Sequence, residues 1–214
     1  MAKICEKGLI VSKVGMTRMV DADGKIIPVT LLKVENQKVT KVLTPERDGY
    51  HGYQVGYFLK AEKNLTKADI SRLRKVDVED NFAKFSEFRT SGSSELSVGS
   101  AMTAELFQGV GSVDVTGITK GRGFQGAVKR WGATIGRMTH GSRFHRRPGS
   151  LGQCTTPGRV YKNKHQPGHM GVVARTVKNI QVMDVDTANN VIAVKGSVPG
   201  HRNGVLEIRP TNKK

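Results

Sequence analysis

Clusters of apolar residues along the first 59 positions predict β-strands. The segments LIVSKVGMTRMV, IIPVTLLKV and KVTKVL are rich in valine and isoleucine, and the turn-forming DADG at 21–24 separates the first two. Runs of this composition, bounded by Asp, Gly and Asn, are typical of strands joined by hairpins. Pro28 should therefore lie near a strand start or an edge. YHGYQVGYFL at 50–59 predicts a further strand, whose tyrosines either pack on the strand surface or stack on bases.

The middle of the chain contains a different pattern. Thr66 precedes KADISRLRKV, and Asp69 follows it by three positions, which predicts a short helix with a capping box. Phe82, Phe85 and Phe88 recur every third position, which we interpret as a helical or irregular packing segment before a loop in SGSSELSVGS.

Strand patterns return on both sides of a long polar segment. GSVDVTGIT at 111–119 precedes that segment, and GVVARTVKNIQVMDVD at 171–186 follows it. A turn at 187–190 then leads to VIAVKGSV, and GVLEIR at 204–209 predicts a last strand. These strands favour an antiparallel barrel or sandwich, from which residues 120 to about 168 leave as a long loop and return. A loop of that length requires a function or a partner that orders it.

Charge is concentrated in that same region. The formal net charge is +17, yet residues 115–183 contain thirteen Lys and Arg and no Asp or Glu, which leaves +4 for the rest of the chain. Such asymmetry indicates a localised nucleic-acid-binding surface. Binding to a membrane surface would require an amphipathic helix, which the many glycines disfavour. Two distant cysteines, Cys5 and Cys154, and the lack of a signal-peptide or membrane-spanning pattern indicate a reducing cytoplasm.

One glycine motif suggests a nucleotide cofactor. Gly121, Gly123 and Gly126 form G-x-G-x-x-G directly after a predicted strand. The dinucleotide site also needs a parallel βαβ pattern and an acidic residue about 20 positions later, but the next acid is Asp184. We therefore interpret these glycines as positions where the backbone approaches phosphates, and we predict no cofactor.

Metal-binding and catalytic residues are predicted to be absent. The zinc-ligand types in the basic segment match no standard cluster, and no carboxylate lies nearby; they are His140, His145, Cys154, His165 and His169. Ser142 with His140 or His145 is a nucleophile and base by sequence proximity alone. The chain is accordingly predicted not to be an enzyme.

RNA binding explains the cations, the interleaved aromatics, the glycines and the missing core together. The predicted RNA-binding residues are Lys120, Arg122, Phe124, Lys129, Arg130, Trp131, Arg137, His140, Arg143, His145, Arg146, Arg147, Arg159, Lys162, Lys164, His165 and His169.

Three long motifs in these regions carry a family resemblance: VDVTGITKGRGFQGAVKRWG at 113–132, THGSRFHRRPGSLGQCTTPGRVYKNKHQPGHMG at 139–171, and the closing DVDTANNVIAVKGSVPGHRNGVLEIRP. Together with GLIVSKVGMTRMV they closely resemble the L-three family of bacterial ribosomal proteins. The resemblance implies a mainly β fold: a six-stranded translation-protein-type β-barrel with a small helical insertion and a long irregular basic extension loop. The expected single domain, 1–214, has its barrel at about 1–60, 95–119 and 170–214, its insertion at about 61–94 and its RNA-penetrating extension at about 120–169.

The resemblance also implies a function and partners. A structural constituent of the large ribosomal subunit is expected, which binds large-subunit (23S) rRNA near its 3′ end and nucleates early subunit assembly. Its extension would support the peptidyl transferase centre, and neighbouring large-subunit proteins would contact the barrel, with no membrane partner. In some bacteria, a glutamine methyltransferase modifies proteins of this family at a G-Q site, and the corresponding residue here is Gln153. The alternative is an unmodified glutamine that contacts RNA. The alternative function is a non-ribosomal architectural nucleic-acid-binding protein.

Overall fold

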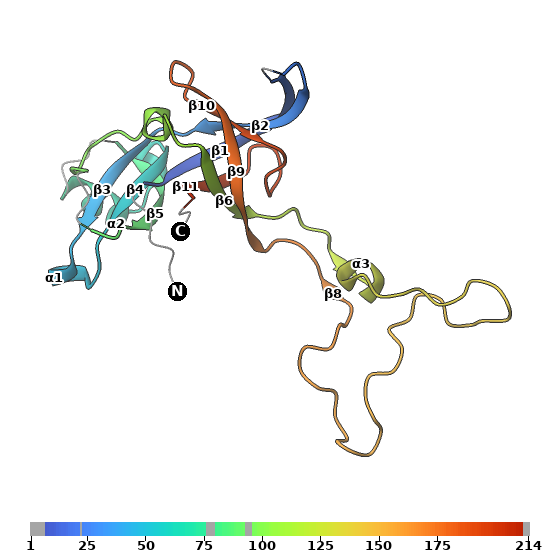
Figure 1. Ribbon diagram of the computed structural model, residues 1–214. Coiled ribbons are helices and arrows are strands. Elements are labelled where there is room, and N and C mark those ends of the chain that lie inside the picture. Colours follow the sequence, from blue (N-terminus) through green and yellow to red (C-terminus); the bar gives the residue numbers. More distant parts are fainter. Residues whose placement is uncertain (1–6, 22, 76–79, 93–95, 212–214) are drawn as a thin grey trace. The chain divides into compact units, whose positions relative to one another are not determined.

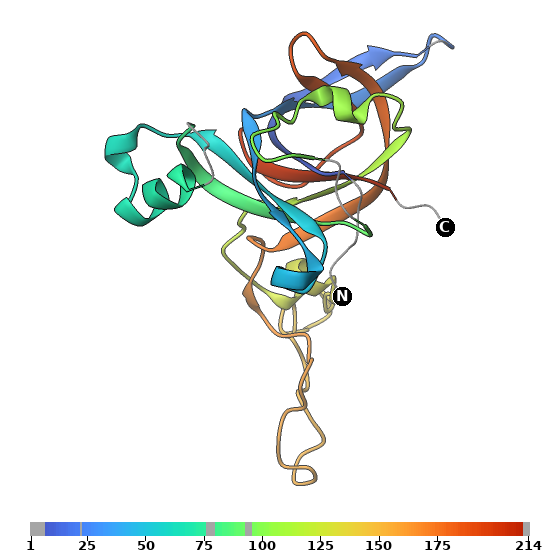
Figure 2. The same cartoon turned by 90° about the vertical axis from the view of Figure 1, so that its left-hand side faces the viewer.

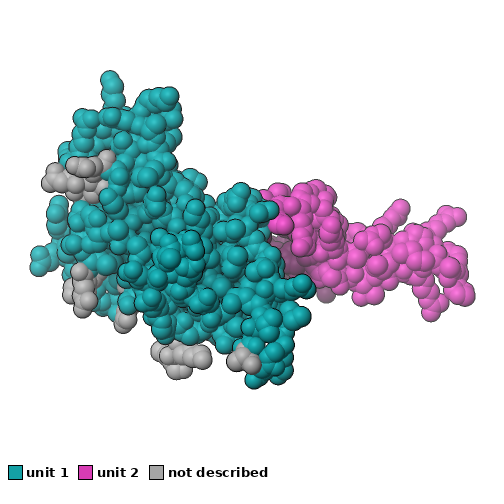
Figure 3. Space-filling model, turned by 90° about the horizontal axis from the view of Figure 1, so that it is seen from above, with its two compact units in different colours: residues 1–118, 174–214 teal, residues 119–173 magenta. Residues whose placement is uncertain are grey.

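The computed structural model describes residues 7–21, 23–75, 80–92 and 96–211. The chain divides into two compact units, which Figure 3 distinguishes by colour. Unit 1 comprises residues 1–118 and 174–214, and unit 2 comprises residues 119–173. The described residues are mainly β, as the sequence predicts. None of the helices in these described ranges has the length and apolar character needed to cross a membrane.

Six strands of unit 1 form a closed barrel in the order β1-β11-β6-β9-β10-β2, and Figure 2 displays them as a ring. Every neighbouring pair is antiparallel. Because the barrel is closed, each of its strands has hydrogen-bonded partners on both sides. The barrel strands are β1 (Leu9–Val20), β2 (Ile26–Val34), β6 (Ser112–Ile118), β9 (Ala174–Asp186), β10 (Val191–Lys195) and β11 (Val205–Pro210).

The predicted hairpins of the barrel are confirmed. β1 pairs with β2 around the turn at 21–24, with Val20 opposite Ile26. β9 pairs with β10 around the turn at 187–190, with Asp186 opposite Val191. Apolar side chains of the barrel strands build the main core, in which Leu9, Leu32, Ile192 and Ile208 are fully buried.

A separate three-stranded sheet lies in unit 1, in the order β3-β4-β5. β3 is Gln37–Leu43, β4 is Gly52–Leu59 and β5 is Phe82–Arg89. The sequence assigned residues up to about 60 to the barrel, but β3 pairs with β4, and β4 pairs with β5, in this separate sheet. A strand pattern specifies that a segment is extended and does not specify its partner, because pairing is decided by distant residues.

The packing segment at 82–89 is a strand and is not helical. Phe82 and Phe85 pack against Leu73, whereas Phe88 belongs to the main core with Tyr53. A three-residue spacing of phenylalanines is typical of a helix, but here the phenylalanines of one strand pack into two different apolar clusters. The tyrosine of the strand at 50–59 that is fully buried, Tyr53, stacks on Phe88 at 5.4 Å between ring centroids.

Short helices connect these strands. Thr66 caps α2 as predicted, because its Oγ1 accepts a hydrogen bond from Asp69 N at 3.3 Å. The helical elements of unit 1 are α1 (Pro45–Asp48), α2 (Lys67–Arg74), and the 3-10 turns η1 (Glu62–Asn64) and η2 (Ala104–Phe107). Unit 2 contains β7 (Phe124–Gln125), α3 (Ala127–Trp131) and β8 (Gly168–His169).

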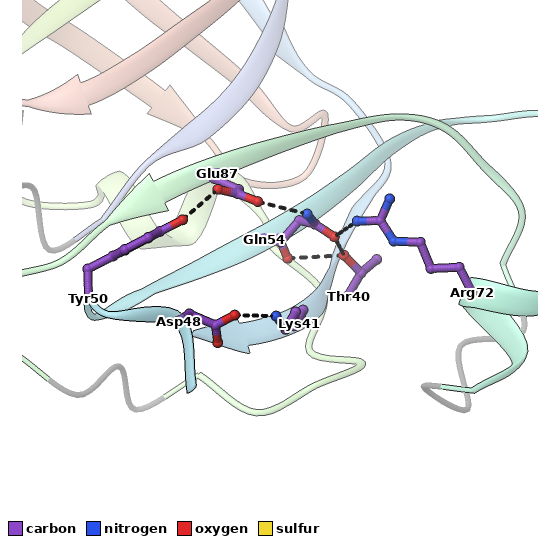
Figure 4. Close-up of polar contacts among 7 residues, drawn as sticks. All are labelled: Thr40, Lys41, Asp48, Tyr50, Gln54, Arg72 and Glu87. Atoms are coloured by element: carbon purple, nitrogen blue, oxygen red, sulfur yellow. Dashed lines mark hydrogen bonds and ion pairs between the residues drawn. The ribbon is translucent and has the colours of Figure 1, made fainter. Parts of the chain in front are cut away.

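A polar network joins α2 to the small sheet (Figure 4). Gln54 donates through Nε2 to Glu87 Oε1 at 3.0 Å, and its Oε1 accepts from Arg72 at 2.5 Å and from Thr40 at 3.1 Å. Tyr50 donates to the other Glu87 oxygen at 3.0 Å, and this bond raises the pKa of Tyr50 above its ordinary 10.0. The nitrogen and oxygen of the Gln54 amide and both oxygens of the Glu87 carboxylate thus have hydrogen-bond partners within the protein. We therefore interpret this network as structural.

Candidate nucleic-acid interface

A short antiparallel ladder joins the two ends of unit 2. Arg122 N donates to Met170 O and Met170 N donates to Gly123 O, both at 2.9 Å. β7 and β8 continue this pairing, with Phe124 opposite His169. Figure 1 shows the chain leaving the ladder in long loops between α3 and β8. The ladder therefore holds together two segments that lie about 45 positions apart in the sequence.

A cluster of side chains at α3 reinforces the ladder. The Trp131 ring stacks on His165, with 4.5 Å between centroids and 9° between planes. The carbonyl of Gln166 accepts hydrogen bonds from Trp131 Nε1 at 2.9 Å and from Arg130 Nη1 at 2.8 Å. The Arg130 guanidinium also lies over the Trp131 ring at 5.0 Å. We call these four residues the α3 clamp, because they tie the helix to the returning segment.

The loops beyond the clamp are organised by local contacts. Residues 132–167 contain no helix or strand in the described structure. Gly136 N donates to His145 O at 2.8 Å, and His145 Nδ1 lies 3.0 Å from Arg137 O. The only buried residue between 119 and 173 is Ala127, so these loops enclose no core of their own.

Positive charge covers unit 2. Its eleven Lys and Arg side chains are exposed except for Arg130, which is half-buried, and its sequence has no carboxylate to neutralise them. The exposed cations are Lys120, Arg122, Lys129, Arg137, Arg143, Arg146, Arg147, Arg159, Lys162 and Lys164. Like charges held close together are repulsive unless counterions or a polyanion neutralise them. Two further cations of the acid-free stretch, Arg175 and Lys178, are exposed on β9 in unit 1.

Large apolar side chains are exposed among these cations. Phe124 is 76% exposed and Trp131 46%, so both rings remain accessible to a ligand, although the Trp131 ring also contacts His165 and Arg130. Sequence reasoning selected the aromatics but missed six exposed aliphatic side chains of unit 2: Ile135, Met138, Leu151, Val160, Val172 and Val173. The sequence feature that could have identified them is the presence of apolar residues without helix or strand periodicity in a cationic, glycine-rich segment. These apolar side chains are available for contact with a binding partner.

The predicted histidines are separated in the structure. His140, His165 and His169 are exposed and His145 is half-buried. Within the described residues, no three His, Cys, Asp or Glu side chains gather as metal ligands would. His165 stacks on Trp131 instead, and His145 contacts a backbone carbonyl.

The glycine motif lies between an antiparallel strand and a five-residue helix. β6 has antiparallel neighbours on both sides, and Gly126 is the N-cap of α3. This arrangement is unlike the parallel βαβ unit of a dinucleotide site. Gly123 and Gly171 instead permit the backbone of the ladder to adopt positive φ, at 65° and 85°.

Gln153 is exposed in the outer loops of unit 2, beside a turn at residues 154–157. Cys154 follows it with φ of 78° and is also exposed. The carboxamide of Gln153 is thus accessible to a modifying enzyme or to RNA.

The arrangement of unit 2 is suited to binding a polyanion. Guanidinium and ammonium groups neutralise phosphates, and exposed rings stack on bases. The α3 clamp and the ladder fix the positions from which these groups project.

Similarity to known proteins agrees with this geometry. A protein-family model described as Ribosomal protein L3 matches residues 89–191. The large ribosomal subunit protein uL3 of Alkaliphilus metalliredigens is 45% identical over 207 residues, which cover 97% of this chain and 98% of that protein. The uL3 protein of Vibrio cholerae is 46% identical over 207 residues, covering 96% and 99%. Because this identity extends over nearly the whole of each chain, the protein belongs to the ribosomal protein L3 family.

Proposed function

We propose that the protein is a structural constituent of the large ribosomal subunit, in the cytoplasm, and that it has no enzymatic activity. Membership of the ribosomal protein L3 family supports this role. In the finer proposal, a barrel of the translation-protein type anchors the protein, and unit 2 is an extension that penetrates the folded large-subunit rRNA. Trp131 and Phe124 would stack on bases or wedge between RNA elements, and the exposed cations would contact phosphates.

One observation carries the RNA-binding proposal: unit 2 has eleven cations, no carboxylate and one buried residue. A segment without a core gains its ordering free energy from a ligand, and a polyanion both neutralises this charge and supplies that ligand. A stable RNA assembly repays that ordering cost better than transient contacts along duplex DNA.

The finer functional details follow the family resemblance. We propose that the protein binds 23S rRNA near its 3′ end, acts early in subunit assembly, and supports the peptidyl transferase centre through unit 2 without performing its chemistry. Other large-subunit proteins would contact unit 1. The exposed arginines of the loops beyond the clamp would contact RNA away from the ladder; they are Arg137, Arg143, Arg146, Arg147 and Arg159.

The test of this function is co-sedimentation. We expect the protein to remain with large subunits after a high-salt wash, because buried RNA contacts are screened less than surface ones. Free protein recovered on chromosomal DNA would support the alternative instead, a non-ribosomal architectural nucleic-acid-binding protein.

For Gln153 we propose N5-methylation by a glutamine methyltransferase. Methylation removes one amide donor and adds a methyl group, a change that suits close packing on RNA. A peptide spanning Gln153 should then weigh about 14 daltons more than its sequence predicts, reflecting one added CH2 group. An unshifted peptide mass would establish the unmodified, RNA-contacting glutamine.

A further inference from the structure

A groove with a volume of about 260 Å³ opens on unit 1. It lies where the link after β2 meets the small sheet, and its lining includes Glu35, Lys38, Leu59, Asp80, Met102 and Asn190. All of these residues belong to unit 1, and none is one of the cations of unit 2.

The floor of the groove is apolar and one side chain at its border is exposed. Val34, Phe82 and Met102 line it and are 5%, 1% and 3% exposed. Leu59 also lines it but is 55% exposed, although the strand that carries it is otherwise mostly buried. A groove of this size can hold one aliphatic or aromatic side chain, and covering Leu59 would remove apolar surface from water.

The surroundings of the groove are acidic. Asn190 Oδ1 accepts a hydrogen bond from Ala104 N at 3.3 Å, so the turn after β9 and the start of η2 border the groove. The segments 33–38, 59–60, 80–82, 101–106 and 184–191 carry five carboxylates and three lysines, a net charge of −2. These groups are Lys33, Glu35, Lys38, Lys60, Asp80, Glu105, Asp184 and Asp186.

The two carboxylates that line the groove differ in whether a lysine neutralises them. Asp80 forms an ion pair with Lys38. Glu35 lines the groove and, among the described residues, forms no ion pair. The chain as a whole has a net charge of +17, so an acid-bordered groove is the reverse of its general character. Phosphates would be repelled here, whereas Lys and Arg would be attracted.

We propose that this groove binds a Lys/Arg-rich segment of a different protein, which inserts one apolar side chain between Leu59 and the buried floor while its cations face Glu35 and the neighbouring carboxylates. This inference rests on the proposed function in one respect, since the partner is expected within the assembled large subunit. The groove supplies the contact area, and the charge selects a cationic protein segment over RNA.

Photo-crosslinking in purified large subunits tests the proposal. The variant Leu59→p-benzoylphenylalanine places a photoreactive group at the groove, and co-sedimentation with large subunits first reports whether the proposed function holds. After irradiation, mass spectrometry should identify an adduct with a Lys/Arg-rich segment of another protein. An adduct with rRNA or with a second copy of this chain, or no adduct in subunits that contain the variant, would overturn the proposal. The same reagent at Asn36, an exposed groove residue, repeats the measurement if the first variant does not fold.

Charge variants supply the matched control. Added to the crosslinking variant, Glu35→Gln should lower the adduct yield about two- to fivefold, as expected for the loss of one exposed ion pair, and Glu35→Lys should lower it further. Glu46→Gln removes an exposed acid of α1 that does not line the groove and should leave the yield unchanged. Equal yields for Glu35→Gln, Glu35→Lys and Glu46→Gln would refute the role assigned to charge.

Discussion

Gly171 is the residue at which backbone conformation most constrains unit 2. Its φ is 85°, and a Cβ atom built there would lie 2.2 Å from the carbonyl oxygen of Lys120. Gly123, on the opposite side of the same ladder, has φ of 65° but no atom within 4 Å of such a Cβ. Both positions favour glycine for conformation, but only Gly171 also needs it for space.

We predict that Gly171→Ala opens the ladder of unit 2 more than Gly123→Ala does. Left-handed backbone alone costs about 1–2 kcal/mol for alanine, and the contact with Lys120 adds a displaced backbone. Hydrogen exchange of the Arg122 and Met170 amides should therefore accelerate in both variants and most in Gly171→Ala. Equal acceleration in the two variants would show that the close approach has no energetic consequence.

Asp186 is a second residue with a defined local role, in the turn between β9 and β10. Its Oδ1 accepts from Ala188 N at 3.0 Å and Asn189 N at 3.1 Å, and its Oδ2 accepts from Asn189 Nδ2 at 2.7 Å. The Asn189 side chain, followed by these backbone amides, lowers the pKa of Asp186 below its ordinary 3.8. Hydrogen bonds that favour the charged carboxylate thus stabilise the turn.

The stability of the turn should therefore depend on pH. A lowered folded-state pKa contributes stability at pH values above 3.8, and that contribution is lost as the pH falls below 3.8 through the folded-state value. We predict that Asp186→Asn lowers the urea midpoint relative to the wild type at about pH 7, and that the difference narrows towards about pH 3. Asp23→Asn, which removes an exposed ion pair with Lys25, should have little effect at either pH. A difference for Asp186→Asn that is constant across this pH range would contradict the assignment.

At the scale of elements, α3 shows how a five-residue helix is held without a core. An isolated helix of this length is unstable in water, so its tertiary contacts must supply its stability. Here they are the Trp131–His165 stack and the two hydrogen bonds to Gln166 O. Arg130 was predicted to contact RNA; in the structure its Nη1 bonds within the chain, which leaves the remaining guanidinium hydrogens for phosphate.

We predict that Arg130→Leu loosens the α3 clamp in the absence of RNA. Loss of one hydrogen bond from a charged donor to Gln166 O, worth about 1 kcal/mol in a half-buried site, should raise amide exchange at His165, Gln166, Gly168 and His169 about fivefold. Gln166→Ala retains the accepting carbonyl and should leave exchange unchanged. If Gln166→Ala had the larger effect, the side chain rather than the carbonyl would be the tie.

At the scale of the whole molecule, the two units divide charge and core between them. Nearly all buried side chains belong to unit 1, as do all the acids of the sequence, whereas unit 2 holds eleven cations. A unit with a core folds through its own packing, and a unit with charge of one sign is completed by a ligand of the other sign. Under the proposed function, this division would make RNA affinity a property mainly of unit 2.

The salt dependence of RNA binding should reflect that division. If about six cations of unit 2 each neutralise a phosphate, the log–log slope of affinity for duplex RNA against salt should be about −5, with the duplex-DNA coefficient as a guide. We predict that Arg146→Gln with Arg147→Gln reduces the magnitude of the slope by about 2. Arg47→Gln with Lys63→Gln, exposed in unit 1, should leave it unchanged. A wild-type slope near zero would contradict the electrostatic basis of the proposed function.

Local pattern was sufficient to predict several elements of this protein. The strands at the N-terminus, the turns at 21–24 and 187–190, the cap at Thr66 and the acid-free segment all follow from residues close together in sequence. Secondary-structure propensity, helix capping and local charge depend on residues a few positions apart, so they can be recognised from the sequence alone.

Only the tertiary structure decided which strands pair and what they enclose. The barrel closes through contacts such as Leu9 opposite Ile208, and the small sheet recruits residues 82–89 as a strand although their phenylalanine spacing suggests a helix. The Trp131–His165 stack and the groove at Glu35 likewise join residues distant in sequence. Burial of an apolar face is favourable against any other apolar face of suitable shape. A local pattern therefore predicts that a segment is extended, whereas its partner strand depends on the packing of the complete chain.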